Sequence, residues 1–137
     1  MLDRTDLLIL EELSKNSRIT MKELGKKVHL TGPATSARVE KLEENDVIQG
    51  YSIKVNQEKM GYSIHAFIQV FMKDINHQPY LSFLKNQKDF VMNNYIVSGE
   101  SCYLLESKFP SNEKLDEFLE GLSKYVSYKL SIVINNK

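Results

Sequence analysis

The hydrophobic periodicity of the chain changes near Gly61, and this change divides the sequence into two parts. Before Gly61, apolar residues recur three and four positions apart, which is typical of short amphipathic helices. After it, segments with alternating apolar residues are interleaved with segments of helical spacing, in the order βαββαβ. A chain of 137 residues is long enough for two small domains. We therefore expect an α+β protein with a helical N-terminal domain and a C-terminal domain built on a sheet.

The first part contains three helix start signals. Asp3 is suited to cap a first helix that ends at Asn16. Thr20 and Glu23 form a capping box, in which each side chain satisfies an exposed backbone amide, and this box begins a second helix. Thr31 can cap a third helix that starts about three residues after the second. A short turn between two short helices is typical of the helix-turn-helix, which places its second helix in the major groove of DNA.

The third helix is predicted to have an inward side and an exposed side. Its inward residues, repeating at helical spacing, are Thr35, Val39 and Leu42. The opposite surface has small, uncharged side chains at its centre and basic side chains at its flanks. We expect the centre to face base edges and Arg38 and Lys41 to contact phosphates. Lys22 and Thr31, which lie nearer the turn between the second and third helices, are added to this site. The predicted DNA-binding residues are therefore Lys22, Thr31, Pro33, Ser36, Ala37, Arg38 and Lys41.

The distribution of charge supports a DNA-binding function, although the whole chain is neutral. It has 18 basic and 18 acidic residues. From Lys15 to Lys41, however, there are seven basic residues and only two acidic ones. A local excess of positive charge on the predicted helices favours double-stranded DNA as the partner.

The segment after the third helix is predicted to be extended. Residues 47–53 have the apolar character of a strand pair or wing, which would make residues 1–50 a winged helix-turn-helix domain. Residues 51–62 are predicted to form a linker strand, and residues 63–137 the second domain.

The sequence resembles the leucine-responsive, or feast/famine, regulators of the Lrp/AsnC type. The matching positions are Leu2-Asp3 with Asp6, Ile9-Leu10, Arg18-Ile19, Glu23-Leu24, Leu30-Thr31, Arg38-Val39, Leu42-Glu43, Val47-Ile48 and Gly50-Tyr51. The resemblance implies a helix-turn-helix over about residues 21–40. Two positions depart from the family pattern: Asp46 replaces a glycine and Thr35 replaces an apolar residue. Aspartate tolerates the left-handed conformation and threonine can be half-buried, so both departures are compatible with the fold.

The second domain is predicted to be ferredoxin-like, a βαββαβ unit in which both helices cover one face of an antiparallel sheet. Its predicted strands are residues 64–72, 91–98, 101–109 and 126–134, and its predicted helices are residues 77–85 and 115–122. In the first strand, Ala66, Ile68 and Val70 alternate with Phe67 and Phe71, so both faces of the sheet offer apolar surface. The helices can cover only one face, and a second copy of the chain is the expected partner for the other. The resemblance likewise implies a homodimer that can assemble further into a tetramer or octamer.

The resemblance also implies a site for a free amino acid at the hairpin around Gly99. The tentative effector-binding residues are Gly99, Glu100, Ser101 and Cys102. In the family an aspartate is common at the position of Cys102, where its carboxylate would pair with an ammonium group. Glu100 could take its place, and Cys102 could alternatively act as a redox sensor or be a half-buried strand residue.

The sequence contains no set of residues arranged for catalysis or metal binding. It has no histidine pair at metal-ligand spacing, no CxxC motif and no phosphate-binding glycine loop, so we expect neither an enzyme nor a cofactor. Two alternatives remain open: an architectural protein that wraps DNA, and a tetrapyrrole decarboxylase-like enzyme of the same layout. No apolar run is long enough to cross a bilayer, and the start of the chain lacks the pattern of a signal peptide. We therefore expect a cytoplasmic, nucleoid-associated protein.

Overall fold

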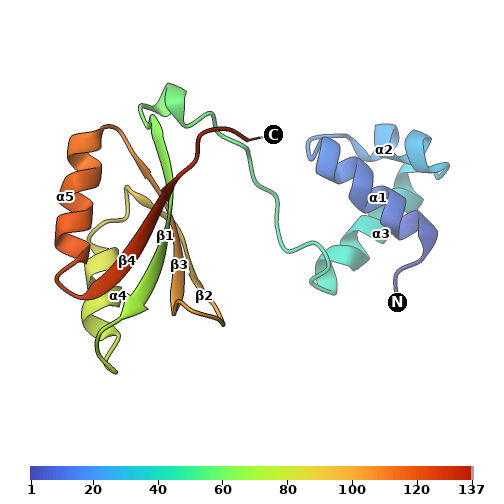
Figure 1. Ribbon diagram of the computed structural model, residues 1–137. Coiled ribbons are helices and arrows are strands. Elements are labelled where there is room, and N and C mark those ends of the chain that lie inside the picture. The colour runs from blue at the N-terminus through green and yellow to red at the C-terminus, as the bar shows by residue number, and fades with distance from the viewer. Residues whose placement is uncertain (137) are drawn as a thin grey trace. The chain divides into compact units, whose positions relative to one another are not determined.

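A computed structural model describes residues 1–136 of the chain. It contains two compact units, which divide between Lys54 and Val55 (Figure 1). The first unit is built of helices alone, and the second contains the sheet.

The N-terminal unit consists of three helices, α1 (Arg4–Lys15), α2 (Met21–Val28) and α3 (Gly32–Glu44). Each begins at the predicted cap, because the side chains of Asp3, Thr20 and Thr31 accept hydrogen bonds from backbone amides in the first turn. Each helix contributes one apolar stripe to a common core. The buried apolar residues of this core are Ile9, Leu13, Ile19, Leu24, Val28, Val39 and Leu42.

The turn between α2 and α3 is tight and depends on two residues. His29 ends α2 with φ 62°, in the left-handed region. Gly25 allows the chain to return closely, since a Cβ atom at this position would lie 2.5 Å from the carbonyl oxygen of Leu30. The helices are thereby held in a helix-turn-helix arrangement, with Thr35 fully buried between them.

The structure assigns no strand to the segments that the sequence predicts as a wing and as a linker strand. Residues 47–53 and 51–62 contain no strand; the only regular element is a short 3₁₀ helix, η1 (Glu58–Met60). The backbone groups of residues 49–55 form no hydrogen bond with other backbone groups among the described residues. A strand exists only when another strand pairs with it, and among residues 1–136 no strand pairs with the segment after α3. Asp46 does adopt the left-handed conformation, with φ 58°.

The C-terminal unit has the predicted ferredoxin-like topology. Its elements are β1 (Ile64–Met72), α4 (Gln78–Lys85), β2 (Val91–Ile96), β3 (Tyr103–Phe109), α5 (Asn112–Leu122) and β4 (Val126–Ile132). The four strands are antiparallel in the order β2-β3-β1-β4. Both helices lie on the same side of the sheet (Figure 1), and the buried residues of β1, β3, α4 and α5 form one core on that side.

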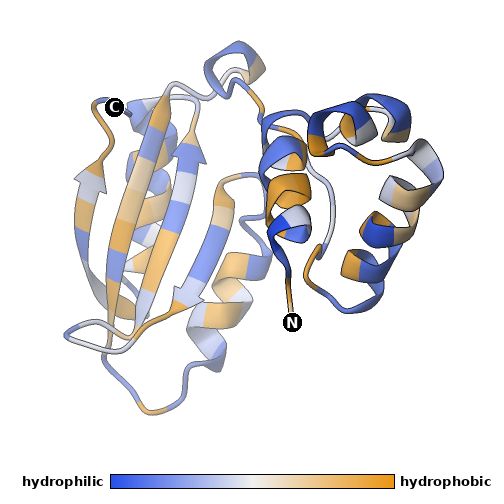
Figure 2. Cartoon of the chain, turned by 90° about the vertical axis from the view of Figure 1, so that its right-hand side faces the viewer, coloured by the Kyte–Doolittle hydropathy of each residue, from blue (hydrophilic) through white to orange (hydrophobic). Residues whose placement is uncertain are grey.

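Neither α4 nor α5 covers the other face of the sheet, which Figure 2 shows toward the viewer. In β1, Ala66, Ile68 and Val70 are fully buried, while Phe67 and Phe71 remain partly exposed on the open face. The Lys129 ammonium group lies 5.6 Å from the centre of the Phe71 ring. The open face therefore carries the apolar surface that the alternation of β1 predicts, and Lys129 adds a charge beside it.

Candidate nucleic-acid interface

The helix-turn-helix brings the N-terminal ends of α2 and α3 together. Gly32, at the start of α3, packs against the backbone of Lys22 in α2, so that a Cβ atom added to Gly32 would lie 3.9 Å from the Lys22 Cα atom. Lys22 itself is exposed. Thr31 is also exposed, and its hydroxyl group is occupied as the cap of α3, where it accepts a hydrogen bond from the Ala34 amide at 3.2 Å.

The outer surface of α3 carries small, accessible side chains, as predicted. Pro33, Ser36, Ala37 and Lys41 are all exposed, whereas Val39 is buried. Small side chains allow the helix backbone to approach a groove closely. They offer few hydrogen-bonding groups for reading base edges, a task for which Arg, Asn and Gln are better suited.

Arg38 does not share this free surface, because two carboxylates of α1 hold its guanidinium group. Its Nη1 atom lies 2.7 Å from Asp3 Oδ2 and 3.2 Å from Asp6 Oδ1. Two carboxylates and one guanidinium leave this cluster with a net negative charge, which does not favour phosphate. The sequence predicts a phosphate contact for Arg38, whereas the structure places this residue at the junction of α1 and α3.

The ion pairs also change the pKa values of the residues in the cluster. The hydrogen bond from Arg38 lowers the pKa of the Asp3 carboxyl group, and the backbone amide of Asp6 acts in the same direction. The hydrogen bond to Asp3 raises the pKa of the Arg38 guanidinium group. Both changes favour the charged forms, so Arg38 and Asp3 remain paired at neutral pH.

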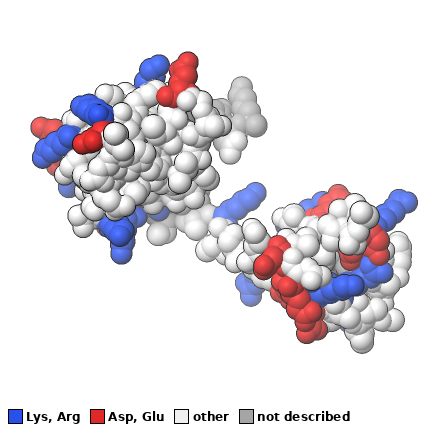
Figure 3. Space-filling view, turned by 90° about the horizontal axis from the view of Figure 1, so that it is seen from below, with Lys and Arg blue, Asp and Glu red and all other residues white. Residues whose placement is uncertain are grey.

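Internal pairing reduces the positive charge that is available to a partner. Among the seven basic residues from position 15 to 41, Lys15 pairs with Glu11 and Glu12, Lys27 lies 3.8 Å from Glu12, and Arg38 is held by α1. Acidic and basic side chains accordingly lie close together on the helical unit in Figure 3. Within residues 1–136, the cations of this segment without an acidic partner are Arg18, Lys22, Lys26 and Lys41.

Two of these free cations, Arg18 and Lys26, are absent from the predicted site. Both are exposed. Their only signal in the sequence is their contribution to the basic segment, because neither lies on the third helix. The structure adds them as candidates for phosphate contacts.

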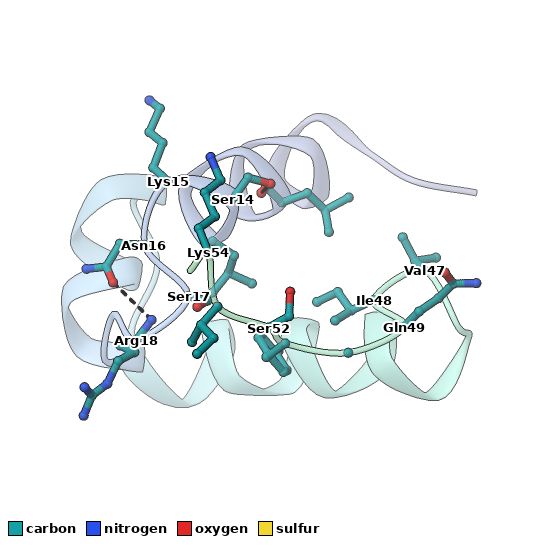
Figure 4. A pocket seen from close by; sticks show the side chains of 15 residues that line it. Ser14, Lys15, Asn16, Ser17, Arg18, Val47, Ile48, Gln49, Ser52 and Lys54 are labelled. Atoms are coloured by element: carbon teal, nitrogen blue, oxygen red, sulfur yellow. Dashed lines mark hydrogen bonds between the residues drawn. The ribbon is translucent and has the colours of Figure 1, made fainter. Parts of the chain in front are cut away.

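A groove of about 820 Å³ lies in the same unit, between the end of α1 and the extended residues 47–54 (Figure 4). Its lining includes Lys15, Arg18 and Lys54 and no acidic side chain. In Figure 4, Lys15 and Lys54 extend to the same side of the groove, and Arg18 extends in another direction. The Arg18 amide donates to the side-chain oxygen of Asn16 at 3.1 Å, which fixes the loop before α2.

The tentative effector residues lie in the hairpin between β2 and β3. Gly99 has φ 131°, a conformation that suits glycine, and Glu100 is exposed at the tip. Ser101 and Cys102 are half-buried, and the Cys102 amide donates to the Val70 carbonyl at 2.9 Å. The hairpin therefore presents Glu100 outward and joins Cys102 to the end of β1.

No group of three or more His, Cys, Asp or Glu side chains suited to a metal ion occurs in residues 1–136. Across the same described residues, none of the helices combines the length and apolar character needed to cross a membrane.

Comparison with known proteins gives consistent matches over both units. Residues 2–49 match the family described as winged helix-turn-helix DNA-binding. The HTH-type transcriptional regulator LrpA of Bacillus subtilis (strain 168) is 61% identical over 134 residues, which cover 98% of each chain. The structure of Bacillus subtilis LrpC is similar with a TM-score of 0.92 and 29% identity, covering 100% of this chain and 97% of that one. The feast or famine regulatory protein Rv3291c from M. tuberculosis, complexed with L-methionine, has a TM-score of 0.88 and 28% identity, covering 99% and 94%.

Proposed function

Because this chain belongs to the Lrp/AsnC, or feast/famine, family of DNA-binding transcriptional regulators, we propose that it binds degenerate DNA sites as a dimer or higher oligomer under the control of a small molecule. Since such a regulator acts on chromosomal DNA, we also propose that it works at the nucleoid.

The single observation that carries the DNA proposal is the accessible surface of α3. Pro33, Ser36 and Ala37 are exposed at the end of the helix that the turn presents. We assign these residues to the floor of the major groove, and Lys22 and Lys41 to phosphates on either side. Thr31 supports the interface by capping α3, and Arg38 supports it by holding α3 against α1.

The composition of this surface argues for degenerate recognition. A serine hydroxyl group and an alanine methyl group discriminate weakly between base pairs, so the shape and bending of the DNA contribute much of the specificity. We expect the preferred sites to be AT-rich. The alternative, an architectural protein, would bind and bend DNA with still less preference for particular sequences.

The open sheet face supports self-association. Phe67 and Phe71 lie on the face that neither α4 nor α5 covers. Exposed aromatic surface on a sheet favours an interface, and a second copy of the same face would bury it on both chains. Two copies would also place two recognition helices on one duplex, about one helical turn or a multiple of it apart.

We assign control by a small molecule to the hairpin residues Gly99, Glu100, Ser101 and Cys102. The structural relative Rv3291c is described in complex with L-methionine. In this chain Cys102 offers no charge to an ammonium group, and Glu100 is the nearest acidic residue in the hairpin. A free amino acid is the proposed effector, with Glu100 as the partner of its ammonium group.

An enzyme acting on tetrapyrroles is the weaker alternative. The match to a relative described as a transcriptional regulator extends over 98% of the chain, which favours regulation over catalysis. Purified protein that bound a porphyrin and ignored DNA would support the enzyme instead.

Selection of bound sequences from a random DNA library tests the proposal. The parent should enrich AT-rich sites, and Ala37→Glu should lower the affinity for them at least about a hundredfold, because a carboxylate would face the phosphate backbone and base edges. Ser82→Glu is the matched control, since it adds the same charge at an exposed position in α4. Equal binding by Ala37→Glu and the control would place the DNA interface elsewhere.

A further inference from the structure

The C-terminal unit contains a cavity at the end of the sheet away from the Gly99 hairpin. Its volume is about 660 Å³, and residues from η1, β1, β2, β3 and the segment after β4 line it. Lys108, near the end of β3, lies six residues after Cys102, which corresponds to about 20 Å along a strand. The cavity is therefore separate from the proposed amino-acid site.

Lys108 is the only lysine or arginine that lines this cavity within the described residues. Its ammonium group donates to Gln57 Oε1 at 3.2 Å and lies 4.4 Å from the centre of the Tyr62 ring. Within residues 1–136 it has no carboxylate oxygen within 4.0 Å. Two neutral contacts thus hold a partly buried positive charge in place without neutralising it.

Glu106, which lies two residues before Lys108 in β3, already has other partners. Glu106 accepts from the Asn93 amide group at 2.9 Å and lies 2.7 Å from His65 Nε2. Its side chain is only 16% exposed, so it is not free to move to Lys108. Glu106 does not itself line the cavity, and the acidic residue that does among residues 1–136, Glu58, is exposed and forms no ion pair with Lys108.

The remaining walls are largely apolar or amide-bearing, and Ser63 and His65 also contribute to them. Ile64, Met92 and Val133 contribute aliphatic surface, while Asn56, Gln57 and Asn135 contribute amide groups. An anchored cation beside aliphatic side chains is suited to a small ligand with a carboxylate head and an aliphatic body.

We propose that this cavity binds a small aliphatic carboxylate through an ion pair with Lys108. Two sources share this chemistry, the 2-oxo acids and the free amino acids. The 2-oxo acids are favoured, because Glu106 is occupied and only the exposed Glu58 remains for an ammonium group.

Methyl-labelled full-length protein provides the test, with 3-methyl-2-oxobutanoate as the probe. The probe should shift the methyl signals of Met92 and Ile64, which line the cavity, and leave Ile96 near the Gly99 hairpin unchanged. 3-Methyl-2-butanone, which replaces the carboxylate with a methyl group, should cause no such shifts. The affinity for L-valine is measured in the same way. Tighter binding of the 2-oxo acid assigns the site to that class, and tighter binding of L-valine assigns it to amino acids.

Lys108→Met should raise the Kd of the probe about tenfold or more, because it removes the charge and keeps a side chain of similar length. Lys85→Met is the control, since Lys85 is an exposed lysine at the end of α4 and does not line the cavity. Unchanged probe affinity in Lys108→Met, or shifts confined to Ile96, would overturn the proposal. Both variants should bind DNA like the parent without probe and elute at the same volume in gel filtration, so this test is independent of the DNA proposal.

Discussion

Arg38 in the recognition helix lies 2.7 Å from Asp3, the residue that caps α1, although 35 positions separate them in the sequence. The contact joins the presented helix to the first helix of the unit. Asp3 consequently has two roles, because it also accepts the Asp6 amide at 2.8 Å. The orientation of α3 relative to α1 depends on this pair as well as on the apolar core.

We predict that Arg38→Gln and Lys41→Gln separate stability from DNA contact. Arg38→Gln should lower the thermal midpoint of the N-terminal unit and leave the salt dependence of DNA binding unchanged. Lys41→Gln should leave stability unchanged and reduce the slope of log K against log salt by about 0.9, the value for one lost phosphate contact. Calorimetry and salt titrations measure both quantities. The same loss of slope in Arg38→Gln would mean that Arg38 exchanges Asp3 for a phosphate on binding.

The pair also predicts a defined sensitivity to acid. Arg38 lowers the pKa of Asp3 from its usual 3.8, so the carboxylate stabilises the folded state above about pH 3.8. That contribution is lost as the pH falls further through the folded-state pKa. Asparagine caps helices as well as aspartate does, so Asp3→Asn removes the charge alone. The stability difference between the parent and Asp3→Asn should be constant at higher pH and vanish in acid, as followed by denaturant unfolding. Asp116→Asn, at an exposed position of α5, serves as the control.

Gly25→Ala should destabilise the N-terminal unit even though alanine is the better helix former. The propensity gain is about 1 kcal/mol, whereas a Cβ atom 2.5 Å from the Leu30 carbonyl oxygen forces the turn to move. Overpacking of this kind costs about 1–3 kcal/mol. Gly32→Ala is the control, because its Cβ atom would have no neighbour closer than 3.9 Å. We expect a lower thermal midpoint for Gly25→Ala and an unchanged or slightly higher one for Gly32→Ala. Equal midpoints would show that the turn adapts without cost.

Phe71→Lys should weaken self-association at least about a hundredfold, since it would place a charge in the proposed interface of both chains. Sedimentation velocity over a concentration series measures the effect. Ile75→Lys is the control, because Ile75 is 97% exposed in the loop after β1. A Phe71→Lys variant that associates like the parent would assign the interface to another surface.

The sequence by itself determines the features that depend on neighbouring residues. Asp3, Thr20 and Thr31 cap their helices through bonds to amides three positions away, and such local bonds are visible in the order of residues. The alternation in β1 likewise determines that Ala66, Ile68 and Val70 share one face, because successive side chains of a strand point to opposite sides. The fold class, the helix-turn-helix and the exposed surface of α3 all follow from such local patterns.

Only the tertiary structure decides which charges and backbone groups remain available. Arg38 and Lys41 are equivalent as flanking cations of one helix, but α1 reaches Arg38 alone. Residues 47–53 have the composition of a strand, yet no partner strand lies beside them. Lys108 becomes the cation of a cavity through contacts with Gln57 and Tyr62, about 50 positions away. Ion pairs, strand pairing and cavities depend on distances between elements, and these distances arise only when the chain packs.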